Sequence, residues 1–260
     1  MSAGPNGTAR GVLEVRRLSV VFDGFKAIDG LDLTVDEGEV RFVIGPNGAG
    51  KTTLIDVITG MTRPQSGTVR FDGQSLLGKA EFDIVAMGVG RTFQTPSVFE
   101  QLSVLENLDL AASFRRPLRQ LLRRRRGVQP EVASALETVG LAGRAEAPAG
   151  VLSHGQKQWL EIGMLLVQGP KLLLLDEPVA GMSKDERSRT GELLHEIART
   201  RTVIVVEHDM EFLRRFASRV TVMHEGRVLC EGTVAEVQAD PHVQAVYLGR
   251  SRDTRTGADL

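Results

Sequence analysis

The residues whose types and spacing point most directly to chemistry form the run GPNGAGKTT. It matches G-x-x-x-x-G-K-[ST], a pattern whose glycines let backbone N–H groups close around phosphate oxygens at a helix N-terminus. The lysine can reach the β- and γ-phosphates of a nucleotide, and the next hydroxyl can ligate Mg²⁺. The predicted contacts to nucleotide in this loop are Gly45, Pro46, Asn47, Gly48, Ala49, Gly50, Lys51, Thr52 and Thr53.

The segments on either side of the loop fit this interpretation. Residues 39–44, EVRFVI, are apolar and β-branched and predict a buried strand. Residues 52–60, TTLIDVITG, predict a helix that ends at Gly60. Strand, loop and helix together predict a nucleotide site, but they do not separate a kinase, a GTPase, a motor and a transporter ATPase.

Two carboxylates follow a run of four leucines. Asp176 and Glu177 come directly after this predicted buried strand and therefore lie at the carboxyl edge of a parallel sheet, where ligands bind. Asp176 is expected to hold Mg²⁺, directly or through water. Glu177 points elsewhere and is expected to act as general base on an attacking water. The alternative is a strand end with two solvated acids.

Two further polar residues stand at predicted segment ends. Gln94, in RTFQT, could contact Mg²⁺ or the attacking water and report the state of the nucleotide; alone it would be an ordinary surface glutamine. His208, in VVEHD, ends a predicted strand and is placed to touch the γ-phosphate; alone it would be a satisfied polar residue. Both belong to the predicted catalytic set.

The run LSHGQ predicts a second anion site. Ser153 is a helix N-cap, and Gly155 leaves a backbone N–H open at the helix N-terminus. A chain with one phosphate loop has no need of a second such site, so we expect this one to serve a nucleotide held by another subunit. The alternative is an ordinary capped helix.

The whole chain sets limits on these interpretations. Its 260 residues carry a formal net charge of −1, which argues against a nucleic-acid specialist. A single cysteine, Cys230, allows no internal disulfide and suits a reducing cytosol. The polar N-terminus does not resemble a signal peptide, and no apolar run approaches the roughly 18–20 residues that cross a bilayer. We therefore expect any membrane role to act through a partner.

The segment pattern predicts an α/β fold: a mainly parallel sheet with helices on both faces, an antiparallel N-terminal β subdomain and an inserted α-helical subdomain. One domain is expected over residues 11–250, with disordered tails at 1–10 and 251–260 and the helical insertion at about 96–165. The antiparallel strands are expected at 12–22 and 31–35. Later expected segments are strands 171–176 and 202–208, a helix 183–199 and a hairpin 219–232.

Helices in the insertion are signalled locally. A capping box, Ser103 to Glu106, opens the first of them. A cluster of arginines between Arg115 and Arg126 favours a solvated basic helix face, with a lipid-headgroup contact as the alternative.

Taken together, these motifs resemble the ATP-binding cassette (ABC) family. Its phosphate loop, glutamine loop, signature, second nucleotide motif and switch histidine resemble Gly45–Thr52, Gln94, Leu152–Gln156, Leu172–Glu177 and His208, in the right order. The resemblance implies a P-loop NTPase that hydrolyses ATP with Mg²⁺ as a head-to-tail dimer, each ATP lying between one subunit's phosphate loop and the other's signature. The residues implied to contact ATP in trans are Ser153, Gly155 and Gln156.

The family also implies an aromatic ring beneath the adenine, and Phe22 stands at the matching place; the alternative is an edge-strand core residue. Two positions depart from the family pattern. His154 replaces the usual glycine of the signature. Ser183 stands where many members carry an acidic residue that couples the two ATP sites, which puts coupling through that position in doubt.

A finer resemblance is to the ATPases of uptake systems for branched-chain amino acids, amides and urea. LSHGQKQWLEIGMLL is particularly similar to the urea-type subunit, so import of urea is the main prediction and import of a branched-chain amino acid or short amide the alternative. The resemblance implies a second ATPase subunit (a non-identical sister, or a second copy), two membrane permeases, an external solute-binding protein acting indirectly, and no nucleic acid. It places the chain at the cytoplasmic face of the membrane, bound through the permeases.

Two rivals come from other classes. A soluble ABC ATPase of DNA repair or translation usually shows a long coiled coil or two cassettes, and neither is present. A P-loop kinase of small molecules would leave LSHGQ and His208 unexplained.

Overall fold

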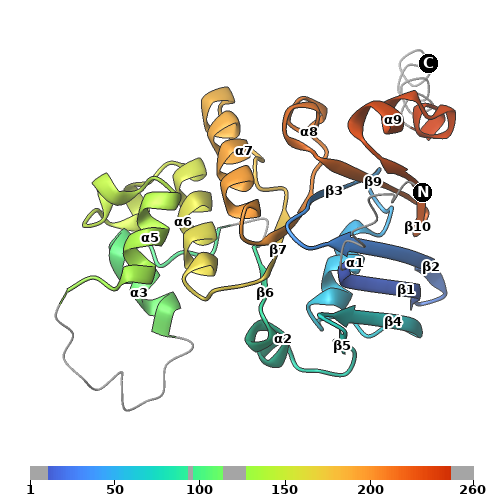
Figure 1. The fold of residues 1–260 in the computed structure, drawn as a ribbon, viewed down its shortest axis with the longest axis horizontal. Helices are drawn as coiled ribbons and strands as arrows, with labels where there is room; N and C mark the ends of the chain where they lie inside the picture. The colour runs from blue at the N-terminus through green and yellow to red at the C-terminus, as the bar shows by residue number, and fades with distance from the viewer. Residues whose placement is uncertain (1–10, 93–95, 114–126, 247–260) are drawn as a thin grey trace, which may run out of the picture.

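A computed structural model describes residues 11–92, 96–113 and 127–246 of the chain. Two sheets lie side by side, and helices cover the larger one (Figure 1). The larger sheet has the order β10-β9-β3-β8-β7-β6. Its strands are β3 (Val40–Ile44), β6 (Val89–Arg91), β7 (Leu172–Asp176), β8 (Thr202–Val206), β9 (Arg219–His224) and β10 (Arg227–Gly232).

The larger sheet is parallel except at one edge. Strands β6, β7, β8, β3 and β9 run parallel, and only β10 pairs antiparallel, with β9. In β7, Leu173 and Leu175 pack in one apolar core while Leu172 and Leu174 pack in the other. Because both faces are covered, β7 is buried along its whole length and reads in sequence as a continuous apolar run. The predicted parallel sheet with helices on both faces is confirmed.

The smaller sheet is antiparallel, in the order β2-β1-β4-β5. Its strands are β1 (Gly11–Phe22), β2 (Phe25–Asp36), β4 (Ser66–Phe71) and β5 (Gln74–Ser75). The antiparallel pair was predicted, but its second strand begins at Phe25 rather than at Leu31. A tight turn at Asp23 and Gly24, both with positive φ, closes the hairpin early. The polar residues of FKAIDG hide the apolar alternation there.

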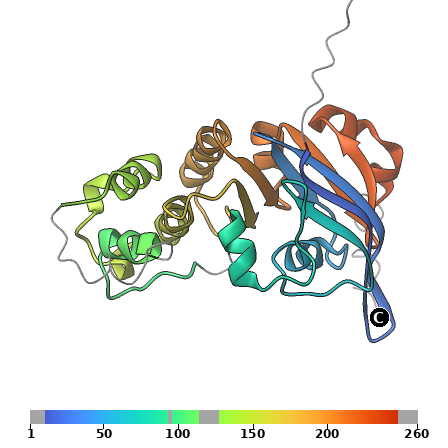
Figure 2. The same cartoon turned by 60° about the horizontal axis from the view of Figure 1, so that its bottom comes forward.

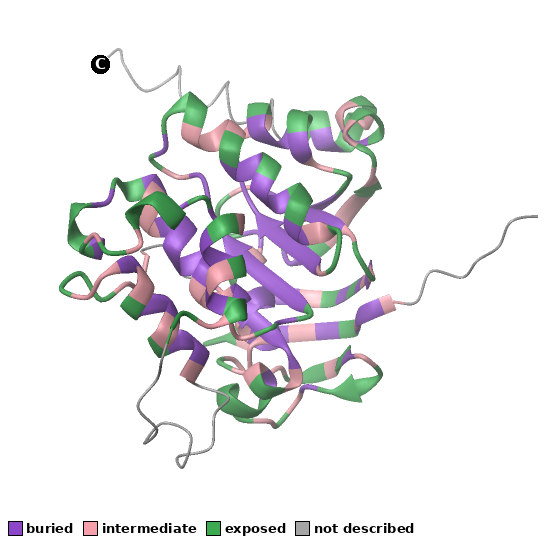
Figure 3. Ribbon diagram, turned by 60° about the vertical axis from the view of Figure 1, so that its left-hand side comes forward, coloured by how far each residue is buried: buried purple, intermediate pink, exposed green. Residues whose placement is uncertain are grey.

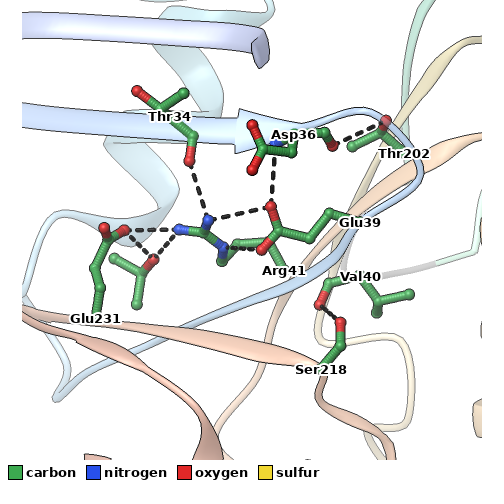
Figure 4. A network of polar contacts seen from close by, with 9 residues as sticks. Thr34, Asp36, Glu39, Val40, Arg41, Thr202, Ser218 and Glu231 are labelled. Carbon is green, nitrogen blue, oxygen red and sulfur yellow. Dashed lines mark hydrogen bonds and ion pairs between the residues drawn. The ribbon is translucent and has the colours of Figure 1, made fainter. Parts of the chain in front are cut away.

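A buried arginine ties the two sheets together (Figure 4). The Arg41 guanidinium, 1% exposed, donates to the Thr34 carbonyl of β2 at 3.0 Å. It also donates to Glu39 Oε1 at 2.6 Å and to Glu231 Oε1 at 2.7 Å. Its NH1 nitrogen donates to the Thr221 hydroxyl at 2.8 Å. Two carboxylates and two neutral acceptors thus satisfy one buried cation, which fixes β2 against β3, β9 and β10.

The described helices fall into two groups. Helices α3 (Val104–Ser113), α5 (Pro130–Thr138) and α6 (His154–Leu166) gather at the end of the molecule away from the smaller sheet (Figures 1 and 2). Two short 3₁₀ helices, Ala142–Arg144 and Ala149–Val151, lead into α6. The others are α1 (Lys51–Ile58), α2 (Glu81–Met87), α7 (Lys184–Ala198), α8 (Met210–Phe216) and α9 (Val234–Ala239).

Some predictions fall outside the described residues: the tails 1–10 and 251–260 and the whole Arg115–Arg126 cluster. The extent of the helical insertion, about 96–165, stays a prediction. Over the ranges that the structure describes, no helix combines the length and apolar character needed to cross a membrane.

Capping boxes open α3, α6 and α7, as local sequence indicates. At α3, Ser103 N donates to Glu106 Oε2 at 2.7 Å, and Glu106 N donates to the Ser103 hydroxyl at 3.1 Å. The Trp159 indole of α6 donates to Thr190 Oγ1 of α7 at 2.9 Å, and the Arg189 guanidinium lies over its ring. Buried residues, purple in Figure 3, line the contact between these helices and the sheet. Helices α6 and α7 are therefore fixed relative to β7.

Candidate functional site

The phosphate loop connects β3 to α1 and depends on glycine at two close approaches. A Cβ on Gly45 would lie 2.2 Å from the Met223 carbonyl oxygen, and one on Gly50 would lie 2.5 Å from that of Ala27. Gly50 also has a φ of +98°, which side chains rarely adopt. Any larger residue would have to displace backbone of β9 or β2, so the loop geometry requires the glycines that the motif predicts.

Neighbouring backbone fixes the loop from outside. The turn between β9 and β10 places Gly226 so that its N–H donates to the Ala49 carbonyl at 3.1 Å. The Gly226 carbonyl accepts from Asp29 N of β2 at 3.0 Å. Within the loop, the Lys51 ammonium donates to the carbonyls of Gly45 at 2.8 Å and Pro46 at 3.1 Å. The lysine therefore already lies across the loop where phosphate would bind.

Asp176 ends β7 and is only 2% exposed. Burial raises the pKa of its carboxyl; the nearby Arg91 guanidinium opposes that rise, and the charges of Glu177 and Asp56 add to it. Arg91 Nη2 lies 3.6 Å from Asp176 Oδ2. A hard cation would relieve the cost of this buried negative charge.

Arg91 makes contacts that the sequence motifs did not predict. It projects from the end of β6 and pairs with Asp56 Oδ1 of α1 at 2.5 Å as well as with Asp176. It thus links the helix of the phosphate loop to the acidic end of β7. Arg91 ends β6, and Asp176 ends the neighbouring strand β7. A basic residue at one strand end and an acidic residue at the next are the signal that could have indicated this contact.

Glu177 follows with φ +50°, a left-handed conformation that is uncommon for residues other than glycine. Its N–H donates to the Val206 carbonyl of β8 at 2.9 Å. This turn carries its side chain toward His208, which follows β8: His208 Nδ1 lies 3.3 Å from Glu177 Oε1. Both side chains reach solvent, and the structure brings these two predicted residues together.

A second buried carboxylate, Glu207, was not predicted. It is 1% exposed, and its Oε2 lies 4.0 Å from His208 Nδ1. Its Oε2 accepts from the N–H groups of His208 at 2.9 Å and Asp209 at 3.2 Å, and its Oε1 accepts from Val179 N at 3.3 Å. Burial raises its pKa, and these backbone donors oppose the rise. Glu207 therefore sets the positions of both chain segments; a charged residue within the apolar run TVIVVEH was the available signal.

The signature corner, which we define as Ser153, Gly155, Ser183 and Glu186, lies where α6 and α7 begin. The Ser153 hydroxyl accepts from Gln156 N at 3.2 Å and donates to Glu186 Oε1 at 2.8 Å. Ser183 N donates to Glu186 Oε2 at 3.0 Å. The predicted caps are confirmed, whereas the contact between the two helices through Glu186 was not foreseen.

The remaining predicted residues divide clearly. Phe22 ends β1 and is 47% exposed, so it is not a core residue; its stacking on adenine stays a prediction. His154 is exposed beside Gly181. Gln94 lies outside the described residues. Helix α6 lies across β6 and β7 from α1, so the signature corner and the phosphate loop occupy different sides of these strands (Figures 1 and 2).

The donor set suits Mg²⁺ held jointly with a nucleotide. Thr52 presents an exposed hydroxyl at the start of α1, and Asp176 supplies a buried carboxylate at the same sheet edge. Among the described residues, no group of three His, Cys, Asp or Glu side chains forms a self-sufficient metal site. Mg²⁺ typically combines one or two protein oxygens with substrate phosphates and water, which these residues allow.

Comparison with known proteins agrees with this geometry. Residues 28–180 match the family model "ABC transporter", and residues 227–253 match "Branched-chain amino acid ATP-binding cassette transporter". The high-affinity branched-chain amino acid transport ATP-binding protein BraF of Pseudomonas aeruginosa is 36% identical over 94% of this chain and 100% of its own length. LivG of Escherichia coli, with the same description, is 34% identical over 92% of this chain and 98% of its own.

A solved structure of the ADP conformation of an ATP-binding cassette of an ABC transporter superposes with a TM-score of 0.80 and 30% identity. It covers 92% of this chain and 99% of that one. The predicted P-loop NTPase fold with its antiparallel and helical parts is therefore confirmed. The chain belongs to the ABC transporter family and is an ATPase subunit of the branched-chain amino acid type.

Proposed function

We propose that this ATPase energises import of branched-chain amino acids or closely related small amides. The observation that carries the choice of substrate is the match of residues 227–253 to the branched-chain amino acid model, together with relatives named for that transport. The prediction of urea, made from the LSHGQKQWLEIGMLL segment, has no support among these relatives, and the alternative fits better.

ATP binding begins at the phosphate loop. Loop N–H groups and the N-terminus of α1 hold the phosphates, and Lys51 transfers its hydrogen bonds from the Gly45 and Pro46 carbonyls to phosphate oxygens. Phe22 stacks on the adenine. Thr52, Asp176 and Gln94 would hold Mg²⁺, which would neutralise charge on the phosphates.

Hydrolysis follows at the end of β7. Glu177 takes a proton from the attacking water, and His208, 3.3 Å away, orients that carboxylate and contacts the γ-phosphate. Glu207 and the backbone turn at Glu177 hold this pair in place before substrate arrives.

Efficient hydrolysis requires a second ATPase subunit. The N-terminus of α6, with Ser153, Gly155 and Gln156, contacts the ATP held by the partner, and the partner's signature completes the site of this chain. The partner is a non-identical sister or a second copy. The helical part passes closure of the dimer to two membrane permeases. These permeases receive solute from an external binding protein. Contact with the permeases holds the chain at the cytoplasmic face of the membrane.

Uptake of labelled solutes tests this proposal. Cells that lack this subunit are expected to lose high-affinity uptake of labelled leucine while urea uptake stays at the wild-type rate. Loss of urea uptake alone would reverse the choice of substrate. Co-purification with permeases supports the transporter role, and a stable complex with nucleic acid instead would support the soluble DNA-repair or translation alternative.

A further inference from the structure

Glu186 occupies the junction of two helix N-termini. Its Oε2 accepts from Ser183 N and from the Ser183 hydroxyl, both at 3.0 Å, and so closes the capping box of α7. Its Oε1 accepts from the Ser153 hydroxyl, the N-cap of α6, at 2.8 Å. One carboxylate therefore serves both helices, and the second contact is not needed to cap either of them.

The Ser153 hydroxyl has a single proton to donate, and it already donates it in the hydrogen bond to Glu186. Its oxygen accepts from Gln156 N at 3.2 Å, so the hydroxyl is used both as donor and as acceptor. A γ-phosphate oxygen of bound ATP is an acceptor only. Ser153 therefore cannot donate to Glu186 and to a phosphate at the same time.

We infer that Glu186 is a positioning residue that withholds the Ser153 hydroxyl from ATP, so that closing the nucleotide sandwich requires this hydrogen bond to break. The inference rests on the proposed function, in which Ser153 contacts the ATP of the partner subunit. It adds to that function an opposing contact within this chain, which raises the ATP concentration needed for closure.

The charge of Glu186 acts in the same direction. Hydrogen bonds from the Ser183 backbone and from Ser153 lower its pKa, so the carboxylate is ionised at neutral pH. It lies against Gly155, where an added Cβ would be 2.7 Å from Glu186 Oε1. An anion at this helix N-terminus competes with the phosphate for the same partial positive charge. Glu186 is thus a competing anion as well as a competing acceptor.

The test compares Glu186→Gln with wild type in the purified complex of both ATPase subunits and the permeases. The amide is neutral and a weaker acceptor than the carboxylate, so Ser153 is released more easily. We expect the ATP concentration for half-maximal hydrolysis to fall roughly tenfold, with kcat changed less than about twofold. Damage to the cap of α7 alone would lower kcat and the melting temperature without lowering that concentration.

Glu236→Gln is the matched control. Glu236 closes an equivalent capping box with Thr233 at α9, with no signature serine nearby, and its pKa is lowered by the same kind of hydrogen bond. We expect this variant to keep the wild-type ATP dependence. An equal fall in both variants, or no fall for Glu186→Gln, would overturn the inference.

Ser153→Ala separates the inference from the proposed function beneath it. If Ser153 contacts ATP in trans, this variant needs more ATP than wild type; an unchanged requirement refutes the contact itself. In the Ser153→Ala background, Glu186→Gln is expected to lower the ATP requirement by clearly less than tenfold, because the hydrogen bond is already absent and only the charge of Glu186 still competes with the phosphate. A persisting tenfold fall would show that Glu186 acts independently of Ser153.

Discussion

The end of β7 and the signature corner present carboxylates prepared in opposite ways. Asp176 is 2% exposed, and burial raises its pKa. Glu186 is partly exposed, and hydrogen bonds from two serines lower its pKa. Burial of the first carboxylate carries a cost that a cation would relieve, whereas the second carboxylate is satisfied by hydrogen bonds within the chain. Under the proposed function, the site for this chain's own nucleotide is thus preorganised, and the signature corner, proposed to contact the partner's nucleotide, is restrained.

The largest expected effect at the nucleotide site is that of Glu177→Gln. Its amide keeps the shape of the side chain but cannot take a proton from water. We expect ATP hydrolysis to fall by about 10²–10⁴-fold while ATP binding and ATP-driven dimerisation persist. Steady-state ATPase measurements and sedimentation with ATP check this, and wild-type-like turnover would remove Glu177 from the role of base.

Lys51→Ala should weaken nucleotide binding itself. The variant removes charge-assisted hydrogen bonds worth about 1.5–3 kcal/mol, so the dissociation constant for ATP should rise by roughly 10–150-fold in titration calorimetry. Lys171→Ala is the control, because Lys171 pairs with Asp72 at the surface, away from the loop. Equal affinity in both variants would contradict the role of Lys51.

The sequence predicted those parts of the fold and the site that depend on local pattern. Phosphate loop, capping boxes and buried parallel strands are each encoded within about a dozen consecutive residues. It did not reveal Arg91 between Asp56 and Asp176, or Glu186 against Ser153, because these contacts join segments far apart in the chain. Their geometry depends on strand order and helix packing, which periodicity does not specify.

A smaller effect, of opposite sign for stability and activity, is expected for Asp176→Asn. Because burial raises the pKa of Asp176, ionisation costs stability as pH rises through the folded-state pKa. Asparagine removes that cost, so the nucleotide-free protein should gain roughly 1 kcal/mol at pH 7, or about 2–4 °C in melting temperature, while hydrolysis is lost. The gain should vanish below the ordinary aspartate pKa of 3.8, where both states are protonated. If Asp176→Asn lost stability at pH 7, burial of the Asp176 carboxylate would not be costly, and its contrast with Glu186 would fail.

The smallest effect concerns the stability that Glu186 contributes. Its pKa is lowered on folding, so its contribution is fully present above the ordinary glutamate value of 4.5 and is lost as pH falls through the folded-state pKa. Glu186→Gln should therefore be slightly less stable than wild type at pH 7, by up to about 1 kcal/mol. This difference in stability should shrink as the pH falls below 4.5 and through the lowered folded-state pKa. Thermal melts across this pH range check the sign, and a difference that grows on acidification would be inconsistent with it.

The turn at Glu225 and Gly226 matters for anyone who labels or engineers this protein. A short hairpin tip far from the phosphate loop in sequence would ordinarily be chosen for an affinity tag, a fluorophore or a circular permutation. Here its backbone bridges Ala49 and Asp29. An insertion at this tip should disable nucleotide binding in a chain that still folds, so reporters belong elsewhere, such as the exposed Gly73 in the turn between β4 and β5.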